Sequence, residues 1–480
     1  NDINLIRSSK YFKRLVFDEI FANFLLSSKI RSKIKKIKKK NKIFDLNYQN
    51  KILKNLKFKL TNDQILALDK INNDMKSKQK MFRLLQGDVG SGKTIVSVIA
   101  ALNAVKAGYQ VAIMAPTEIL AIQHYKYIEE NFKNYCNAEL LTSKTEYKIK
   151  KKILNNLSNN KINILIGTHS LFQSKLSYNN LGLIIIDEQH KFGVNQRKRL
   201  SDKGGDDCDV LVMSATPIPR TMMMTIYGDM DISLIKTKPK NRKPIKTYSK
   251  NESNISEVIK FINKKILNNN QIFWVCPLIK ESKKVDHQSA VKKYQTLNKI
   301  FAEKVDIIHG SMSKDKKDLV LKKFSEKKID ILVSTTVIEV GIDFPNANVI
   351  IIENANKYGL TQLHQLRGRV GRGEKEATCI LIFKSNLSKN ASKRITILKN
   401  SNDGFKIAEE DLKIRGYGDI LGFKQSGIKK YNLADPMQHK DLFYLAEAQI
   451  KKIEKNNFNF ESYNKLIKLY DKVSIINESI

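Results

Sequence analysis

Residues 84–94 read "LLQGDVGSGKT", and this stretch is the strongest fold signal in the chain. An apolar run, Met81 to Leu85, precedes it, and a helical pattern, "TIVSVIAALNAV", follows it. Gly87, Gly92, Lys93 and Thr94 satisfy the pattern G-x-x-x-x-G-K-[ST]. A strand, a glycine loop and a helix in this order turn backbone N–H groups, a helix dipole and one lysine toward phosphate. A tight turn that needs glycine only for its backbone is the alternative, and the flanking strand and helix argue against it.

The length and charge of the chain limit its class and its partners. At 480 residues it is too long for one ordinary core, so two or three domains are expected. The formal net charge is +38, from 86 basic and 48 acidic residues. A surface this basic attracts polyanions, and together with the phosphate loop it favours nucleic acid as the partner. The alternative source of this charge is AT-rich coding, which enriches lysine without selection for binding.

The cysteines and the apolar runs indicate the compartment. Cys136, Cys208, Cys276 and Cys379 lie far apart and form no C-x-x-C pair, so neither a zinc site nor a disulfide framework is predicted. No apolar run approaches the ~20 residues of a membrane span, and no signal-peptide pattern opens the chain. We therefore expect a cytoplasmic, nucleoid-associated location and no membrane contact.

Short apolar runs alternate with amphipathic stretches along most of the chain. In the first half "QVAIMAPT", "INILIGTH", "LGLIIIDEQH" and "DVLVMSAT" all end in polar motifs, which is typical of a parallel sheet with helices on both faces. The stretch "KTKPKNRKPIKT" is a plausible linker, after which the alternation restarts. We predict a long basic helix and linker over 1–55, one α/β domain over 56–236, a second over 237–400, and a mostly helical region over 401–480.

The end of the predicted first helix is strongly basic. Residues 29–42, "KIRSKIKKIKKKNK", hold nine basic side chains and no acidic one. A solvated helix face is the first interpretation of this run, and a track for backbone phosphates is the second.

Two further motifs supply candidates for the chemistry that a bound triphosphate needs. Asp187 and Glu188 end the apolar run "LIII", where one carboxylate could bind Mg²⁺ and the other orient and deprotonate water. The alternative is an acidic strand end that faces solvent. In "QLHQLRGRVGRG", Arg367, Arg369 and Arg372 crowd a glycine-rich segment suited to phosphate contacts across a domain cleft.

These motifs occur in an order that matches a known family. The chain resembles the superfamily 2 helicases, and most closely the RecG branched-DNA helicases, from about Arg14 to about Gly427. The resemblance rests on "LLQGDVGSGKT", "MAPTEILA", "GTHSL", "DEQHKFGVNQR", "SATPIPRTMMMTIYGDMD", "STTVIEVGIDFPNA", "LHQLRGRVGRG" and "DGFKIAEEDLKIRGYGD". The Mfd translocases share much of this pattern, whereas the zinc cysteines of the PriA helicases have no counterpart here.

The resemblance implies a fold and a set of functional residues. The fold is α/β, with two RecA-like parallel-sheet domains in tandem and a mostly helical C-terminal region. Glu188, Gln365, Arg369 and Arg372 would be catalytic, and Arg367 would be a variable position without a catalytic role. Mg²⁺ would be bound by Thr94 and Asp187. The residues that would bind ATP are Gln64, which reads adenine, Gly87, Asp88, Gly90, Ser91, Gly92, Lys93, Thr94, Asp187 and Asp343.

The resemblance also implies how the chain would contact and move along DNA. Ser214 and Thr216 would link hydrolysis to the grip on DNA, and Arg415 and Gln425 would belong to a translocation motif. The segments along the nucleic-acid backbone would hold Pro116, Thr117, Glu118, Gly167, Thr168, His169, Thr335 and Thr336.

The motifs and the resemblance together predict an ATP-dependent double-stranded DNA translocase that remodels stalled forks and Holliday junctions, and the resemblance alone implies a monomer that moves 3′ to 5′. The alternatives are an Mfd-like translocase, a superfamily 2 RNA helicase, or a nucleotide-gated clamp without turnover, which the intact set of Lys93, Glu188, Arg369 and Arg372 disfavours. Branched or duplex DNA is the expected partner, with a single-stranded DNA-binding protein as a further candidate. RecG helicases carry an N-terminal wedge domain, for which no room exists before Arg14, so we expect a fragment of a longer chain.

Overall fold

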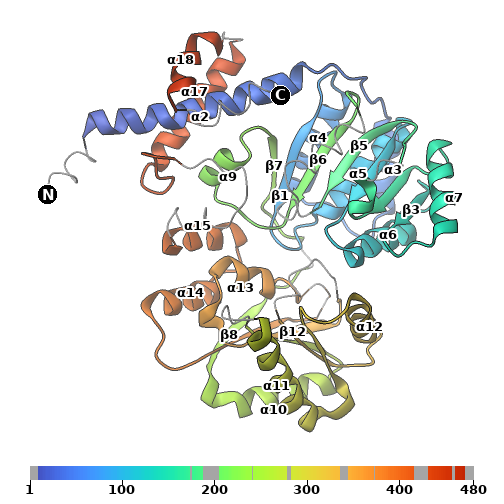
Figure 1. Ribbon diagram of the computed structural model, residues 1–480, viewed down its shortest axis with the longest axis vertical. Coiled ribbons are helices and arrows are strands. Elements are labelled where there is room, and N and C mark those ends of the chain that lie inside the picture. The colour runs from blue at the N-terminus through green and yellow to red at the C-terminus, as the bar shows by residue number, and fades with distance from the viewer. Residues whose placement is uncertain are drawn as a thin grey trace.

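The computed structural model describes residues 9–172, 176–187, 205–239, 242–277, 283–335, 344–371, 373, 375–415, 431–456 and 460–470. Two parallel β-sheets, each with its own helices, lie one above the other in Figure 1, and a third group of helices lies beside the first sheet. The predicted fold class, two RecA-like domains with a helical C-terminal region, is confirmed.

The first sheet has seven strands in the described residues, in the order β3-β4-β2-β5-β6-β1-β7, and every pair in it is parallel. The strands are β1 (Phe82–Gly87), β2 (Gln110–Met114), β3 (Ala138–Leu141), β4 (Ile164–Gly167), β5 (Leu181–Ile186), β6 (Asp209–Ser214) and β7 (Asp231–Ile235). The helices of this domain are α3 (Leu46–Asn55), α4 (Asn62–Lys76), α5 (Lys93–Lys106), α6 (Glu118–Phe132), α7 (Tyr147–Ser158) and α9 (Arg220–Ile226). Because all strands run the same way, their carboxyl ends form one edge.

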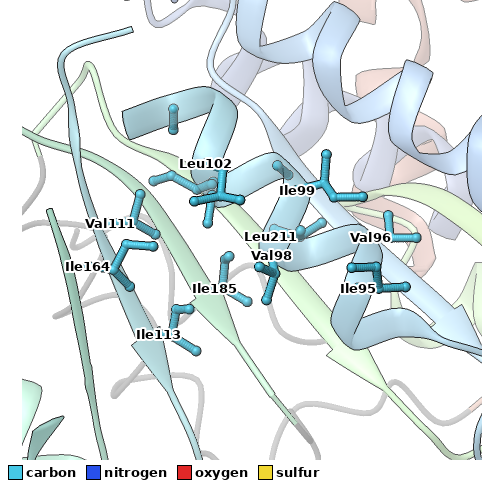
Figure 2. Packing of buried hydrophobic residues seen from close by; sticks show 14 of the residues in the cluster. Ile95, Val96, Val98, Ile99, Leu102, Val111, Ile113, Ile164, Ile185 and Leu211 are labelled. Carbon is cyan, nitrogen blue, oxygen red and sulfur yellow. The ribbon is translucent and has the colours of Figure 1, made fainter. Parts of the chain in front are cut away.

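Helix α5 is mostly apolar and is buried along most of its length, because it lies at the centre of this domain. Figure 2 shows its side chains packed against those of four strands, and its Val96, Ile99 and Leu102 are fully buried. A fully buried Val, Leu or Ile contributes roughly 1.5–3 kcal/mol relative to an exposed one. Truncation of Ile99 to alanine would cost about 2–5 kcal/mol, because a cavity would remain. The packing therefore fixes the start of α5, where the phosphate loop ends.

The second sheet has six strands in the described residues, in the order β10-β11-β9-β12-β13-β8, and is also parallel. The strands are β8 (Lys246–Asn251), β9 (Gln271–Val275), β10 (Val305–Ile308), β11 (Ile331–Ser334), β12 (Ala347–Ile352) and β13 (Thr378–Phe383). The helices around it are α10 (Ile255–Leu267), α11 (Lys283–Phe301), α12 (Lys314–Ser325), α13 (Leu360–Arg367), α14 (Lys389–Asn400) and α15 (Gly404–Arg415). The order differs from that of the first sheet, but the carboxyl ends again share one edge.

The long helix α2 (Lys10–Lys36) packs against α17 (Lys440–Lys455) and α18 (Asn464–Tyr470), at the two ends of the chain (Figure 1). Ile20 and Leu25 of α2 and Phe443 of α17 are fully buried in this contact. Met222 of α9 belongs to the same cluster, so the helical group is joined to the first domain. None of the helices in the described ranges is both long and apolar enough to cross a membrane.

The basic run after α2 is partly buried. Lys39 and Lys42 donate from their Nζ atoms to one carboxylate oxygen of Asp209, at 2.6 and 2.8 Å, and all three side chains are inaccessible to solvent. Burial lowers the pKa of Lys39, although the Asp209 carboxylate opposes this shift. Removal of the carboxylate would leave two buried ammonium groups and cost about 3–5 kcal/mol. These two lysines anchor the chain to the first domain, which neither interpretation of the run anticipated.

Candidate functional site

The phosphate loop lies between β1 and α5, as the opening motif predicts. Gly87 is the last residue of β1, and Lys93 and Thr94 are the first two residues of α5. Gly90 and Gly92 have φ of 72° and 83°, and no side chain caps the start of α5. A helix N-terminus that follows a glycine loop and has a glycine as its N-cap residue is the arrangement that binds a phosphate. Lys93 Nζ donates to the carbonyls of Gly87 and Asp88, at 2.8 and 3.0 Å.

Gln64 joins the start of α4 to the phosphate loop. Its Oε1 accepts from the Thr61 N–H at 2.8 Å in a capping box, and its Nε2 donates to the Ser91 carbonyl at 2.8 Å. Among the described residues the buried Ser91 hydroxyl has no hydrogen-bond partner. An unsatisfied buried hydroxyl in a loop of turned N–H groups fits a bound triphosphate, so the residues present suit ATP.

Asp187 follows β5 at the carboxyl edge of the sheet, where the predicted magnesium ligands belong. Its carboxylate lies 2.9 Å from Nε2 of His124 on α6, and both side chains are nearly buried. Thr94, on α5 at the same edge, would bring a hydroxyl oxygen as the second protein ligand. A carboxylate and a hydroxyl suit Mg²⁺, which is usually bound by one or two protein ligands with phosphates and water. Glu188 lies outside the described residues.

Helix α13 brings the second domain against the first. Gln365, predicted to be catalytic, donates from Nε2 to the Thr216 hydroxyl at 2.8 Å. Thr216 follows β6, and its carbonyl accepts from Nε2 of Gln86 at 3.0 Å. Arg369 is buried just beyond the end of α13, whereas Arg372 lies outside the described residues. The structure therefore connects the segment predicted to sense the γ-phosphate to the segment predicted to grip DNA.

The Asp88 carboxylate contacts both the second domain and the linker. One of its oxygens lies 2.6 Å from Nε2 of His364 on α13, and the other pairs with Nζ of Lys238 at 2.7 Å. Beside it, Arg242 donates to the Val89 carbonyl at 2.6 Å. Both basic residues belong to the stretch predicted to be a linker. The phosphate loop is thus held between this linker and α13.

The remaining predicted residues lie at the carboxyl ends of strands. Thr117 caps α6, Glu118 accepts from the Ser143 N–H, and Gly167 ends β4. Pro116 precedes α6, Thr168 and His169 follow β4, Ser214 ends β6, and Thr335 follows β11. Arg415 ends α15 and donates from Nε to Asp411 at 3.0 Å. Thr336, Asp343 and Gln425 lie outside the described residues.

Four residues around the site carried no functional prediction, namely His364, Lys238, Arg242 and His124. His364 is one residue before Gln365 in the motif, and no spacing rule distinguishes it from a core histidine. The two linker residues were indistinguishable from solvated charges, because only the fold shows that the linker passes over the phosphate loop. Arg367, set aside as variable, is fully buried and donates to Nδ1 of His364 at 3.0 Å.

Comparison with known proteins assigns the chain to a family. Three family models match in succession: DEAD/DEAH box helicase at 61–225, Helicase conserved C-terminal domain at 253–374, and ATP-dependent DNA helicase RecG, domain 3, C-terminal, at 401–472. The ATP-dependent DNA helicase RecG of Aquifex aeolicus is 46% identical over 470 residues, or 96% of this chain and 59% of that protein. The chain belongs to the RecG family.

Other members support the assignment over most of the chain. The RecG of Thermotoga maritima is 45% identical over 460 residues, which is 95% of this chain and 59% of that protein. A solved structure of RecG bound to a three-way DNA junction superposes with a TM-score of 0.75 at 43% identity, over 90% of this chain and 57% of that one. The chain thus spans less than two thirds of the length of these relatives.

Proposed function

We propose that this RecG-family chain is an ATP-driven motor that moves along double-stranded DNA and remodels branched DNA, such as stalled forks and Holliday junctions. The observation that carries the proposal is the contact of α13 with the phosphate loop and Thr216. This contact joins the nucleotide site to the other domain through the buried hydrogen bond between His364 and Asp88 and the partly buried one between Gln365 and Thr216. The solved relative on a three-way DNA junction supports branched DNA as the substrate.

The chemistry proposed for the site is hydrolysis of the terminal phosphate of ATP. ATP bound with Mg²⁺ would supply the phosphoanhydride bond and the charge neutralisation that phosphoryl transfer needs. Lys93 is positioned in the loop to neutralise phosphate charge, and Gln64 holds Ser91 so that the loop keeps its shape. Arg369 would stabilise the charge that develops in the transition state, because its neighbour Gly368 lies against Val89 of the phosphate loop. Glu188 and Arg372 are proposed as catalytic base and second finger from sequence alone.

The contact with DNA is proposed along the carboxyl edges of the two sheets. Pro116 and Thr117 lie between β2 and α6, Glu118 begins α6, and Thr335 follows β11 of the second domain. A net charge of +38 without a recognisable base-reading module fits binding to the phosphate backbone. Affinity for duplex should therefore fall steeply with salt, by about 0.9 log unit per neutralised phosphate for each log unit of salt.

The finer properties are proposals as well. We propose movement from 3′ to 5′, action as a monomer, a cytoplasmic and nucleoid-associated location, and a single-stranded DNA-binding protein as an additional partner. The domain boundaries at residues 55, 236 and 400 are likewise proposed.

The test is a comparison of ATP hydrolysis with branched DNA, linear duplex and RNA as stimulating nucleic acids. We expect the highest stimulation by branched DNA, less by linear duplex and none by RNA. Stimulation by RNA above that by DNA would indicate an RNA helicase instead. Nucleotide-dependent binding of DNA without any turnover would indicate a clamp.

A further inference from the structure

Asp88 has a buried carboxylate that contacts side chains outside the phosphate loop. It is 2% exposed, and it contacts His364 of the second domain and Lys238 of the linker. The Val89 N–H also donates to it, at 2.6 Å. A carboxylate that faced the phosphates of a bound nucleotide would repel them. The contacts of Asp88 with His364 and Lys238 therefore need an explanation other than nucleotide binding.

The protonation state of His364 follows from its two neighbours. Arg367 Nη2 lies 3.0 Å from Nδ1 of His364, and a guanidinium can only donate, so Nδ1 must be the acceptor. The ring is therefore neutral, and its Nε2–H donates to the Asp88 carboxylate at 2.6 Å. A hydrogen bond to a carboxylate is among the stronger kinds. Arg367 is itself fixed, because it donates to the Leu398 carbonyl at 2.6 Å.

The same pair lies where two other segments meet. Lys238 Nζ donates to the Asn402 carbonyl at 2.9 Å as well as pairing with Asp88. Gly404, the first residue of α15, approaches so closely that a Cβ there would lie 2.7 Å from the Asp88 carboxyl and from His364 Nε2. The linker, α13 and the start of α15 thus all contact one carboxylate of the phosphate loop.

We propose that Asp88 and His364 form a positioning pair that holds α13, and with it Gln365 and Arg369, in register with the phosphate loop. This inference rests on the proposed ATP hydrolysis. Asp88 and His364 would act indirectly, through the positions of Gln365 and Arg369. Loss of the pair leaves the loop able to bind nucleotide, since Lys93 and the N–H groups of α5 remain. It removes the alignment that the transition state needs, so turnover falls more than affinity.

The test uses single and double variants of the full chain. Asp88→Asn and His364→Phe should each lower kcat for ATP about 10- to 100-fold and change KM for ATP by about threefold or less. The double variant should be no slower than the worse single one, because both remove the same contact. His364→Gln keeps an N–H donor and should recover much of the rate. Glu376→Gln, which breaks the exposed pair with Lys246, is the matched control and should leave kcat unchanged.

A second measurement does not depend on turnover. Imidazole ¹⁵N spectra of histidine-labelled protein should contain the signal of a neutral ring with its proton on Nε2. This signal should be missing from the spectrum of His364→Gln. The proposed pair would be contradicted if the losses in the double variant were additive, or if KM rose while kcat stayed unchanged. A cationic His364 ring at neutral pH would contradict it as well. Absence of hydrolysis by the unchanged chain would overturn the proposed function instead, and the histidine spectrum would still decide whether the pair exists.

Discussion

Among the described residues, two contacts between the domains have opposite character. Beside the phosphate loop the Asp88 and His364 side chains are 2% and 4% exposed, and the Gln365–Thr216 hydrogen bond lies next to them. On the side of α6, Lys144 pairs with Asp315 and Asp318 of α12 at 2.7 Å each, but Lys144 and Asp315 are 44% and 85% exposed.

The difference indicates which contact keeps one geometry and which one can exchange its partners. Buried polar contacts keep one geometry, because water cannot replace a lost partner. Exposed ion pairs are screened and easily replaced, so Lys144 can release its carboxylates when a phosphate backbone approaches. Ile119, which packs against the core of the second domain, adds a small apolar contact on this side. We therefore expect substitutions beside the phosphate loop to affect turnover far more than those on the α6 side.

Lys93→Ala should have the largest effect. Removal of the Lys93 ammonium group should lower ATP hydrolysis about 100-fold or more, because Lys93 is the only basic residue from Gly87 to Thr94. Duplex binding should remain within a few-fold of the unchanged chain, since one lysine is a small part of a +38 chain. Steady-state ATPase and fluorescence anisotropy would measure the two quantities. Near-normal turnover would show that the nucleotide site lies elsewhere.

Gly368→Ala tests the packing beside the loop. A Cβ at position 368 would lie 2.9 Å from the Val89 Cβ, whereas the backbone at Gly368, with φ of −66°, already suits alanine. The methyl group should push α13 from the loop at a cost of about 1–3 kcal/mol and lower kcat about 10-fold. Gly310→Ala, where a Cβ meets no atom within 4 Å, is the control. Equal rates for both variants would show that this packing is irrelevant to turnover.

Acid should weaken the loop contact before it unfolds the protein. Burial lowers the pKa of His364 below its ordinary 6.5, and Arg367 and Lys238 act in the same direction while Asp88 opposes them. A His364 ring that has left Asp88 takes up a proton more readily than the ring in the contact. The contact of α13 with the phosphate loop is therefore fully stable above pH 6.5, and this stability is lost as the pH falls through the lowered pKa of His364. The kcat should drop a few-fold between about pH 7 and about pH 5.5. The same acid limb in His364→Gln would exclude this histidine as its origin.

Lys144→Ala should have the smallest effect. Without DNA, the ATPase rate should change about twofold or less, because an exposed ion pair contributes little. The salt dependence of duplex binding should decrease slightly if this lysine reaches a phosphate. A loss of turnover as large as that of Gly368→Ala would abolish the distinction between the two contacts.

The sequence predicted the fold and the strand-end motifs well, because each depends on local pattern. The runs that end in "APT", "IGTH", "SAT" and "STT" became strands with polar residues at the carboxyl edge. The phosphate loop followed from spacing and flanking periodicity alone. Its Gly90 and Gly92 have the positive φ that such a loop requires.

The interface residues could not be predicted, because their roles depend on contacts across long sequence separations. Asp88 looked like part of a nucleotide site, and only the position of α13 shows that it faces His364, 276 residues further along the chain. Lys39 and Lys42 looked like surface charges, yet they share one buried carboxylate. Composition could not separate these lysines from the solvated ones around them.

The central claim is that ATP turnover at this interface drives movement along duplex DNA. Displacement of the third strand of a triplex from a linear duplex tests it most directly, because the readout needs translocation but no branch point. We predict that the chain displaces the third strand with ATP, that a non-hydrolysable analogue gives no displacement, and that Lys93→Ala displaces nothing. Duplex-stimulated ATP hydrolysis that leaves the triplex intact would contradict the claim.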